Sequence, residues 1–99
     1  MSQIDLLARL CEWYAEQCND DWEHQSGVLI DTVDNPGWTV TIDLRGTASE
    51  NSVFDPIKLD EGKSNWLMCS KIETKFRGNG DPSKLPVILE HFLRFVGKL

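Results

Sequence analysis

The densest group of side chains able to do chemistry is Asp20-Asp21-Trp22-Glu23-His24. A carboxylate beside an imidazole has the residue types of a general acid–base pair or of two metal ligands. The spacing argues against both, because adjacent residues in an extended segment point to opposite faces and ligands on a helix stand about one turn apart. We therefore expect no catalytic residue, metal or other cofactor. A small metal- or water-dependent enzyme using Glu23 and His24 is the alternative.

This segment has two further interpretations, which the sequence leaves open. In the first, Trp22 packs into the core while Asp or Glu caps a helix or holds the next strands. In the second, the segment presents acids and an aromatic ring to a partner, since loops on a rigid scaffold often carry binding. The second interpretation includes a later turn, and its full set of partner-binding candidates is Asp20, Asp21, Trp22, Glu23, His24, Asp34, Asn35 and Trp38.

The cysteines Cys11, Cys18 and Cys69 are odd in number and stand outside any C-x-x-C pair. This pattern argues against a disulfide framework and a structural zinc site, so we expect buried thiols that pack as small apolar groups. The N-terminus lacks a basic region followed by an apolar stretch, and no apolar run approaches the roughly 20 residues of a membrane helix. We expect a cytoplasmic protein without a membrane partner.

Charge is spread unevenly over the 99 residues, whose net charge is -6. Residues 1–43 carry nine acids and one base, whereas residues 44–99 carry seven acids and nine bases. A nucleic-acid partner is not expected, because such proteins need a basic surface. An acidic face can instead attract and steer a basic protein, although acids also serve only to keep a small protein in solution.

The apolar pattern predicts a helix over residues 4–18, with one face formed by Ile4, Leu7, Cys11, Tyr14 and Cys18. Leu6, Leu10 and Trp13 widen this stripe. Ser2 and Asp5 resemble a capping box at its start. Asn19, Asp20 and Asp21 end it, because their side chains compete for backbone hydrogen bonds.

Alternation predicts a β-hairpin over residues 27–44, closed by Asp34-Asn35-Pro36-Gly37 with Pro36-Gly37 in the middle of a type II turn. Residues 53–59 suit a short edge strand because of Pro56. Residues 66–76 are predicted as one strand with its charged side facing solvent, followed by a loop over residues 78–82.

The C-terminal segment predicts a helix with an apolar stripe at Leu85, Ile88, Leu89, Phe92, Val96 and Leu99. Its start is open between Pro82, with Asp81 as N-cap, and Pro86. The order of elements indicates an α+β fold in one domain over residues 1–99, with a small antiparallel sheet (a hairpin plus one or two further strands) packed by an N-terminal and a C-terminal helix.

Two motifs at a fixed spacing resemble the immunity protein 53 family of bacterial polymorphic toxin systems: Asp21-Trp22-Glu23-His24, and Asp34-Asn35-Pro36-Gly37-Trp38. The resemblance covers roughly residues 6–96. It continues through Trp13-Tyr14, Ile42-Asp43-Leu44, Trp66, Phe76-Arg77-Gly78 and Gly80-Asp81-Pro82. Asn19 and Pro86 depart from the family pattern.

The resemblance implies a cognate toxin domain as the protein partner. Immunity proteins of these systems protect a bacterium by binding the toxin, commonly over its active site, and the family implies no enzymatic activity. The surface expected to bind is acidic and contains tryptophan, formed by residues 20–24 together with the 34–38 turn. A self-assembling structural or interaction domain is a further alternative.

Overall fold

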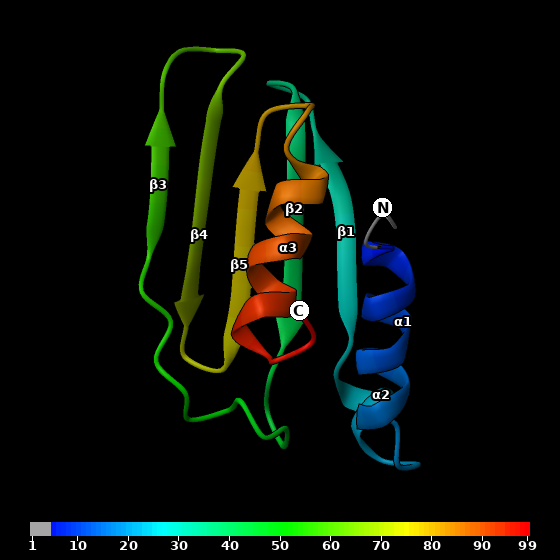
Figure 1. The fold of residues 1–99 in the computed structure, drawn as a ribbon. Coiled ribbons are helices and arrows are strands. Elements are labelled where there is room, and N and C mark those ends of the chain that lie inside the picture. Colours follow the sequence, from blue (N-terminus) through cyan, green and yellow to red (C-terminus); the bar gives the residue numbers. More distant parts are fainter. Residues whose placement is uncertain (1–4) are drawn as a thin grey trace.

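The computed structural model describes residues 5–99. Its centre is a five-stranded antiparallel sheet in the order β1-β2-β5-β4-β3. The strands are β1 (Val28–Val33), β2 (Gly37–Asp43), β3 (Ile57–Asp60), β4 (Trp66–Ile72) and β5 (Lys75–Gly80), and the helices are α1 (Leu6–Gln17), α2 (Trp22–Gln25) and α3 (Leu85–Phe95). The two longer helices lie on the same face of the sheet (Figure 1). The predicted α+β class is confirmed.

The β1–β2 hairpin forms as predicted, with Ile30 opposite Val40. The predicted type II turn is wrong, because Gly37 is already the first residue of β2 and does not have the positive φ that this turn requires. A glycine is needed at position 37 for another reason: a Cβ there would lie 2.5 Å from the carbonyl oxygen of Gly80.

Residues 66–80 form a second hairpin rather than one strand and a loop. Glu73 turns the chain with φ of 56°, so the turn carries none of the usual glycine, proline or asparagine signals. The predicted facing is also wrong, since Leu67 and Cys69 are buried and Met68 is half exposed. The short edge strand begins later than predicted, at Ile57 directly after Pro56.

Helix α3 packs directly over the glycines of β5. A Cβ on Gly78 would lie 2.3 Å from Cγ2 of Ile88, and one on Gly80 would lie 2.6 Å from Cβ of Lys84. The helix begins at Leu85, between the two predicted starts, and Pro86 sits in its first turn, where no intrahelical N–H is required.

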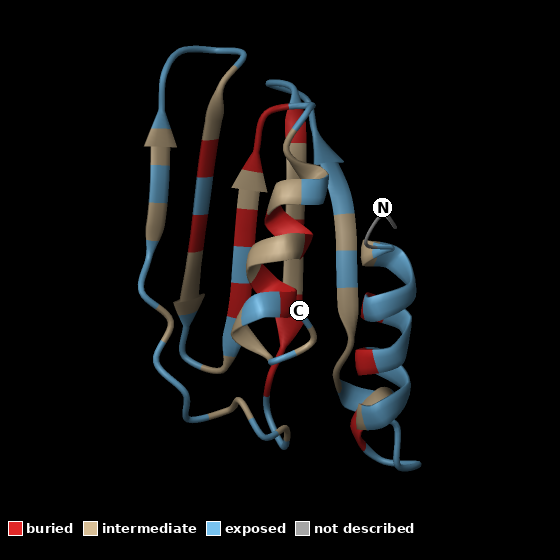
Figure 2. Cartoon of the chain, in the orientation of Figure 1, coloured by how far each residue is buried: buried red, intermediate tan, exposed pale blue. Residues whose placement is uncertain are grey.

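The buried core lies between the sheet and the two helices (Figure 2). Its aromatic rings meet edge to face or tilted: Trp13 of α1 lies 4.9 Å from Phe92 of α3, and Phe76 of β5 lies 5.2 Å from Phe92. Such pairs stabilise beyond their buried area. Phe92 therefore links both helices to the sheet.

Asp81 is a buried carboxylate that joins β4 to the start of α3. Its side chain is 1% exposed, lies 2.8 Å from the Lys84 ammonium, and accepts hydrogen bonds from the Ser83 hydroxyl and from the backbone N–H groups of Ser83 and Trp66. The Lys84 ammonium, followed by the Ser83 donors and the Trp66 N–H, holds the pKa of Asp81 well below its usual range. Asp81 therefore stabilises the turn between β5 and α3. It is not the N-cap of α3, since that position is occupied by Lys84.

Substituting Gly78→Ala should lower the free energy of unfolding by about 1–3 kcal/mol, because the added methyl group overlaps Ile88. Urea denaturation measures this loss. Gly27→Ala is the matched control, since a Cβ there meets no atom within 4 Å. Equal stability of the two variants would contradict the close packing of α3 on β5.

Asp81→Asn should lower the melting temperature at neutral pH, because the amide cannot pair with Lys84. Since the pKa of Asp81 is lowered by folding, its stabilisation is complete above the unfolded value of about 3.9 and is lost as pH falls below it. The difference in melting temperature between wild type and variant should therefore narrow steadily as pH falls from roughly 4 to 2. A constant difference would show that Asp81 is not charged in the folded protein.

Candidate functional site

The Asp20–His24 segment is held by its own hydrogen bonds. The Glu23 carboxylate accepts from the backbone N–H groups of Asn19, at 2.9 Å, and Asp20, at 2.8 Å. The Asn19 side chain accepts in turn from the N–H groups of Asp21 and Trp22. Backbone N–H groups, those of Glu23 itself and Asn19 first, lower the pKa of Glu23. Glu23 therefore holds the loop that leads into α2.

Trp22 belongs to the core, as the first of the two interpretations of this segment predicts. It is 7% exposed and meets Trp13 edge to face at 5.9 Å. Asp20, Asp21 and His24 are exposed. Within residues 5–99, no group of three or more His, Cys, Asp and Glu side chains is placed to hold a metal ion.

The 34–38 turn lies at the opposite end of β1 from this segment (Figure 1). Asp34 and Asn35 are exposed there. Trp38 is half-buried and its indole N–H donates to the Pro82 carbonyl at 3.0 Å, so it braces the hairpin against the entry to α3. The two predicted segments thus lie at opposite ends of β1 and do not form one cluster. Neither Trp22 nor Trp38 is free to act as an exposed aromatic anchor.

The start of β1 is fixed by Asp43, a buried carboxylate at the end of β2. It accepts from the Ser26 hydroxyl at 3.2 Å and from the Arg45 backbone N–H at 2.9 Å. The Asp43 N–H also donates to the Gly27 carbonyl. These contacts place α2 and the first residues of β1 in a fixed position at one side of the sheet.

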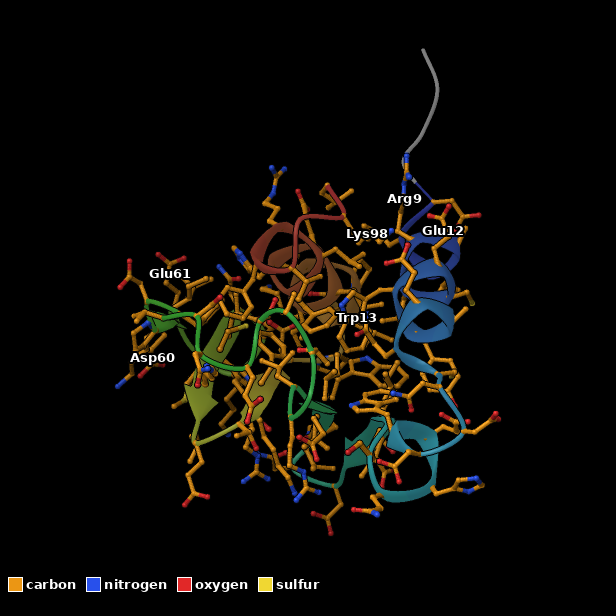
Figure 3. All side chains as sticks on the ribbon, turned by 90° about the horizontal axis from the view of Figure 1, so that it is seen from below. Arg9, Glu12, Trp13, Asp60, Glu61 and Lys98 are labelled. Carbon is orange, nitrogen blue, oxygen red and sulfur yellow. The ribbon has the colours of Figure 1, made fainter. Side chains whose placement is uncertain are left out.

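Acidic charge gathers on the side of the molecule that α1, α2 and β1 form, which we call the β1 flank (residues 5–34). These residues include eight acids and one base, whereas residues 35–99 include eight acids and nine bases. Arg9 pairs with Glu12, and Lys98 reaches Glu16 from beyond α3. Figure 3 shows Glu12 beside α1, and Asp60 and Glu61 at the opposite edge of the sheet, next to β3.

Five aspartates of the β1 flank have no ion-pair partner within residues 5–99. Asp5 caps α1 through the Ala8 N–H, and the other four are Asp20, Asp21, Asp31 and Asp34. All four are exposed. Their charges are therefore not neutralised within the described part of the chain and are available to attract a basic partner.

Helix α1 exposes the stripe that its sequence marks as the apolar face. Leu7 is 61% and Tyr14 40% exposed, and Cys11 is exposed between them, so the predicted core face is wrong. The buried residues are instead Leu10 and Trp13, from the set expected only to widen the stripe. The physical reason is the position of Phe92 in α3. The Trp13 ring packs edge to face against it, so the Trp13 side of α1 faces the core.

The helix termini differ slightly from the prediction. Asp5 is the N-cap, and its carboxylate accepts from the Ala8 N–H at 3.0 Å. Cys18 is the C-cap and is exposed. The predicted roles of Ser2 and Ile4 lie outside the described residues.

A hollow of about 350 Å³ lies between α1 and the start of β1. Its lining is mostly apolar and consists of Leu10, Cys11, Tyr14, Gly27 and Val28. Sequence reasoning missed it, although one signal was present: α1 carries more apolar residues than a single buried stripe requires.

The thiols divide between core and surface. Cys69 is buried, as predicted, and burial raises its pKa to about 11. Cys11 and Cys18 are exposed, so the expectation of buried thiols is wrong for these two. None of the helices within residues 5–99 has the length and apolar character needed to cross a bilayer.

Comparison with known protein families identifies a match over nearly the whole chain. The family model described as immunity protein 53 matches residues 7–97, a range that contains α2, α3, every strand and all but the first residue of α1. No curated protein and no solved structure matches the chain. Because the match covers nearly the whole sequence, the chain belongs to the immunity protein 53 family.

Proposed function

We propose that this protein binds a cognate bacterial toxin domain in the cytoplasm and neutralises it by covering the toxin's catalytic surface. Membership of an immunity family supports a protein partner in general. The observation that locates the proposed binding surface is the uneven distribution of charge, since residues 5–34 carry eight acids and one base. The β1 flank is therefore the proposed binding surface.

The predicted partner-binding residues fall into two groups, one exposed and one that holds the local framework. Asp20, Asp21, His24, Asp34 and Asn35 are exposed and free to meet a partner. Trp22, Glu23 and Trp38 instead hold the framework that presents them. Opposite charge on the partner would speed encounter, whereas contacts made after docking would slow release.

The first test is co-expression with the toxin domain encoded next to this chain. The proposal expects growth to be rescued and a one-to-one complex to elute on size exclusion. In the purified complex the toxin's activity should be lost in proportion to the fraction bound. Killing that continues at full expression of this protein, with no complex, would contradict the proposal.

Neutralising the four unpaired aspartates outside the α1 cap (Asp20→Asn, Asp21→Asn, Asp31→Asn and Asp34→Asn) should slow association by about tenfold or more at low salt and flatten its salt dependence. Asparagine keeps the side-chain shape and suits the positive φ of Asp20. Stopped-flow or surface plasmon resonance at several ionic strengths measures both effects.

The matched control removes the same charge from residues outside the β1 flank, with Asp55→Asn, Asp60→Asn, Glu61→Gln and Glu73→Gln. All four residues are exposed, and the net charge rises equally in both variants. Equal slowing in both would mean that overall charge, and not the β1 flank, governs association.

A further inference from the structure

The two edges of the sheet are unequal. The outer strand β3 has four residues, follows Pro56, and carries Lys58 and Asp60. Short strands, charges and nearby proline are the usual means of preventing an edge from pairing with another chain. The outer strand β1 has six residues, Val-Leu-Ile-Asp-Thr-Val, with one charge and no proline within it. Only β1 has the length and composition of an edge that can accept a further strand.

The backbone groups on the outer side of β1 can be assigned. The bond from the Asp43 N–H to the Gly27 carbonyl shows which residues of β1 bond to β2. Since bonded residues alternate along a strand, the backbone N–H and C=O groups of Leu29, Asp31 and Val33 point toward β2. Val28, Ile30 and Thr32 therefore direct their N–H and C=O groups away from the sheet. The Thr32 N–H meets only the neighbouring Asp31 carboxylate, at 2.8 Å.

Ile30 offers a complete pairing position at the middle of this edge. Within residues 5–99, neither the N–H nor the C=O of Ile30 has a partner outside the sheet. A strand laid antiparallel along β1 would exchange both bonds with Ile30 at the usual spacing of about 4.8 Å.

Helix α1 supplies the second half of the same surface. Leu7, Cys11 and Tyr14 form its exposed stripe, and Cys11 and Tyr14 line the hollow beside Val28. In an added strand, alternate side chains would point toward the helix layer. Apolar side chains at those positions would enter the hollow and cover the exposed stripe.

We propose that the partner docks by adding an extended segment of its chain to the free edge of β1. That segment is basic, to match the unpaired aspartates near both ends of β1, and carries apolar side chains that pack under α1. This inference rests on the proposed function, because it takes the toxin domain as the source of the segment. Backbone hydrogen bonds would supply affinity, and the pockets beside the edge would supply specificity.

A second copy of this protein fits the edge less well. Two copies paired through β1 would bring together two flanks that each carry eight acids and one base. Like charges at a shared interface oppose association. The complementary occupant is therefore a basic partner.

The decisive variant is Thr32→Pro, which removes an outward N–H and places a ring at the edge without breaking a bond to β2. Its control is Lys58→Pro, which does the same at the other edge, where the bond from the Glu61 N–H to the Asn65 carbonyl sets the alternation. Binding to the toxin domain is measured by titration calorimetry, with melting temperatures checked for each variant.

We expect Thr32→Pro to weaken binding about tenfold or more and Lys58→Pro to leave it within about twofold. Equal affinity of wild type and Thr32→Pro would overturn strand addition while leaving the proposed function intact. Absence of a complex with the wild-type protein would contradict the proposed function, and the inference with it. A dimer of the protein alone that Thr32→Pro dissolves would assign the edge to a second copy instead.

A second pair of variants tests the helix side and does not depend on proline being tolerated. Cys11→Lys places a cation in the hollow, whereas Ala15→Lys places the same charge one turn along α1 at an exposed residue that does not line the hollow. Both residues are exposed, so folding should be preserved in both. Cys11→Lys should weaken binding about tenfold and Ala15→Lys should not. Equal affinities of these two variants would remove α1 from the interface.

Discussion

The contact of α3 with β5 is the constraint on which the rest of the structure depends. Gly78 and Gly80 lack side chains, and Ile88 and Lys84 occupy the space. The helix therefore lies close to the middle of the sheet, and Phe92 is brought to where it can take the Trp13 ring of α1. A bulkier residue in β5 would raise α3 and separate α1 from the core. The position of α1, and hence the composition of the β1 flank, follows from two missing side chains.

The sequence predicted the elements with strong periodic patterns and failed where tertiary contacts decide. The two helices, the first hairpin and the α+β class were recoverable from local signals. The second hairpin was not, because Glu73 makes a turn that lacks a turn residue, and because Gly78 and Gly80, typical loop residues, are required by packing. Likewise, no local signal distinguishes which apolar stripe of α1 meets Phe92.

The candidate site was predicted in its charge but not in its geometry. The acids of the N-terminal half do gather on one side, because α1, α2 and β1 are adjacent in space. The tryptophans hold the framework of this side: Trp22 is buried in the core, and Trp38 braces the hairpin through its bond to Pro82. The free edge of β1 could not be found from sequence, since strand order places β2 inside the sheet and β1 outside it.

In the proposed docking, the two stripes of α1 separate folding from recognition along one helix. Leu10 and Trp13 are committed to the interior, whereas Leu7, Cys11 and Tyr14 alternate with them and contribute little to the buried core. Substitutions can therefore accumulate at the second set without loss of the fold. A toxin partner that changes over evolution could therefore be followed by substitutions at these positions. The backbone N–H groups of β1, which only proline would remove, would keep the proposed strand pairing unchanged.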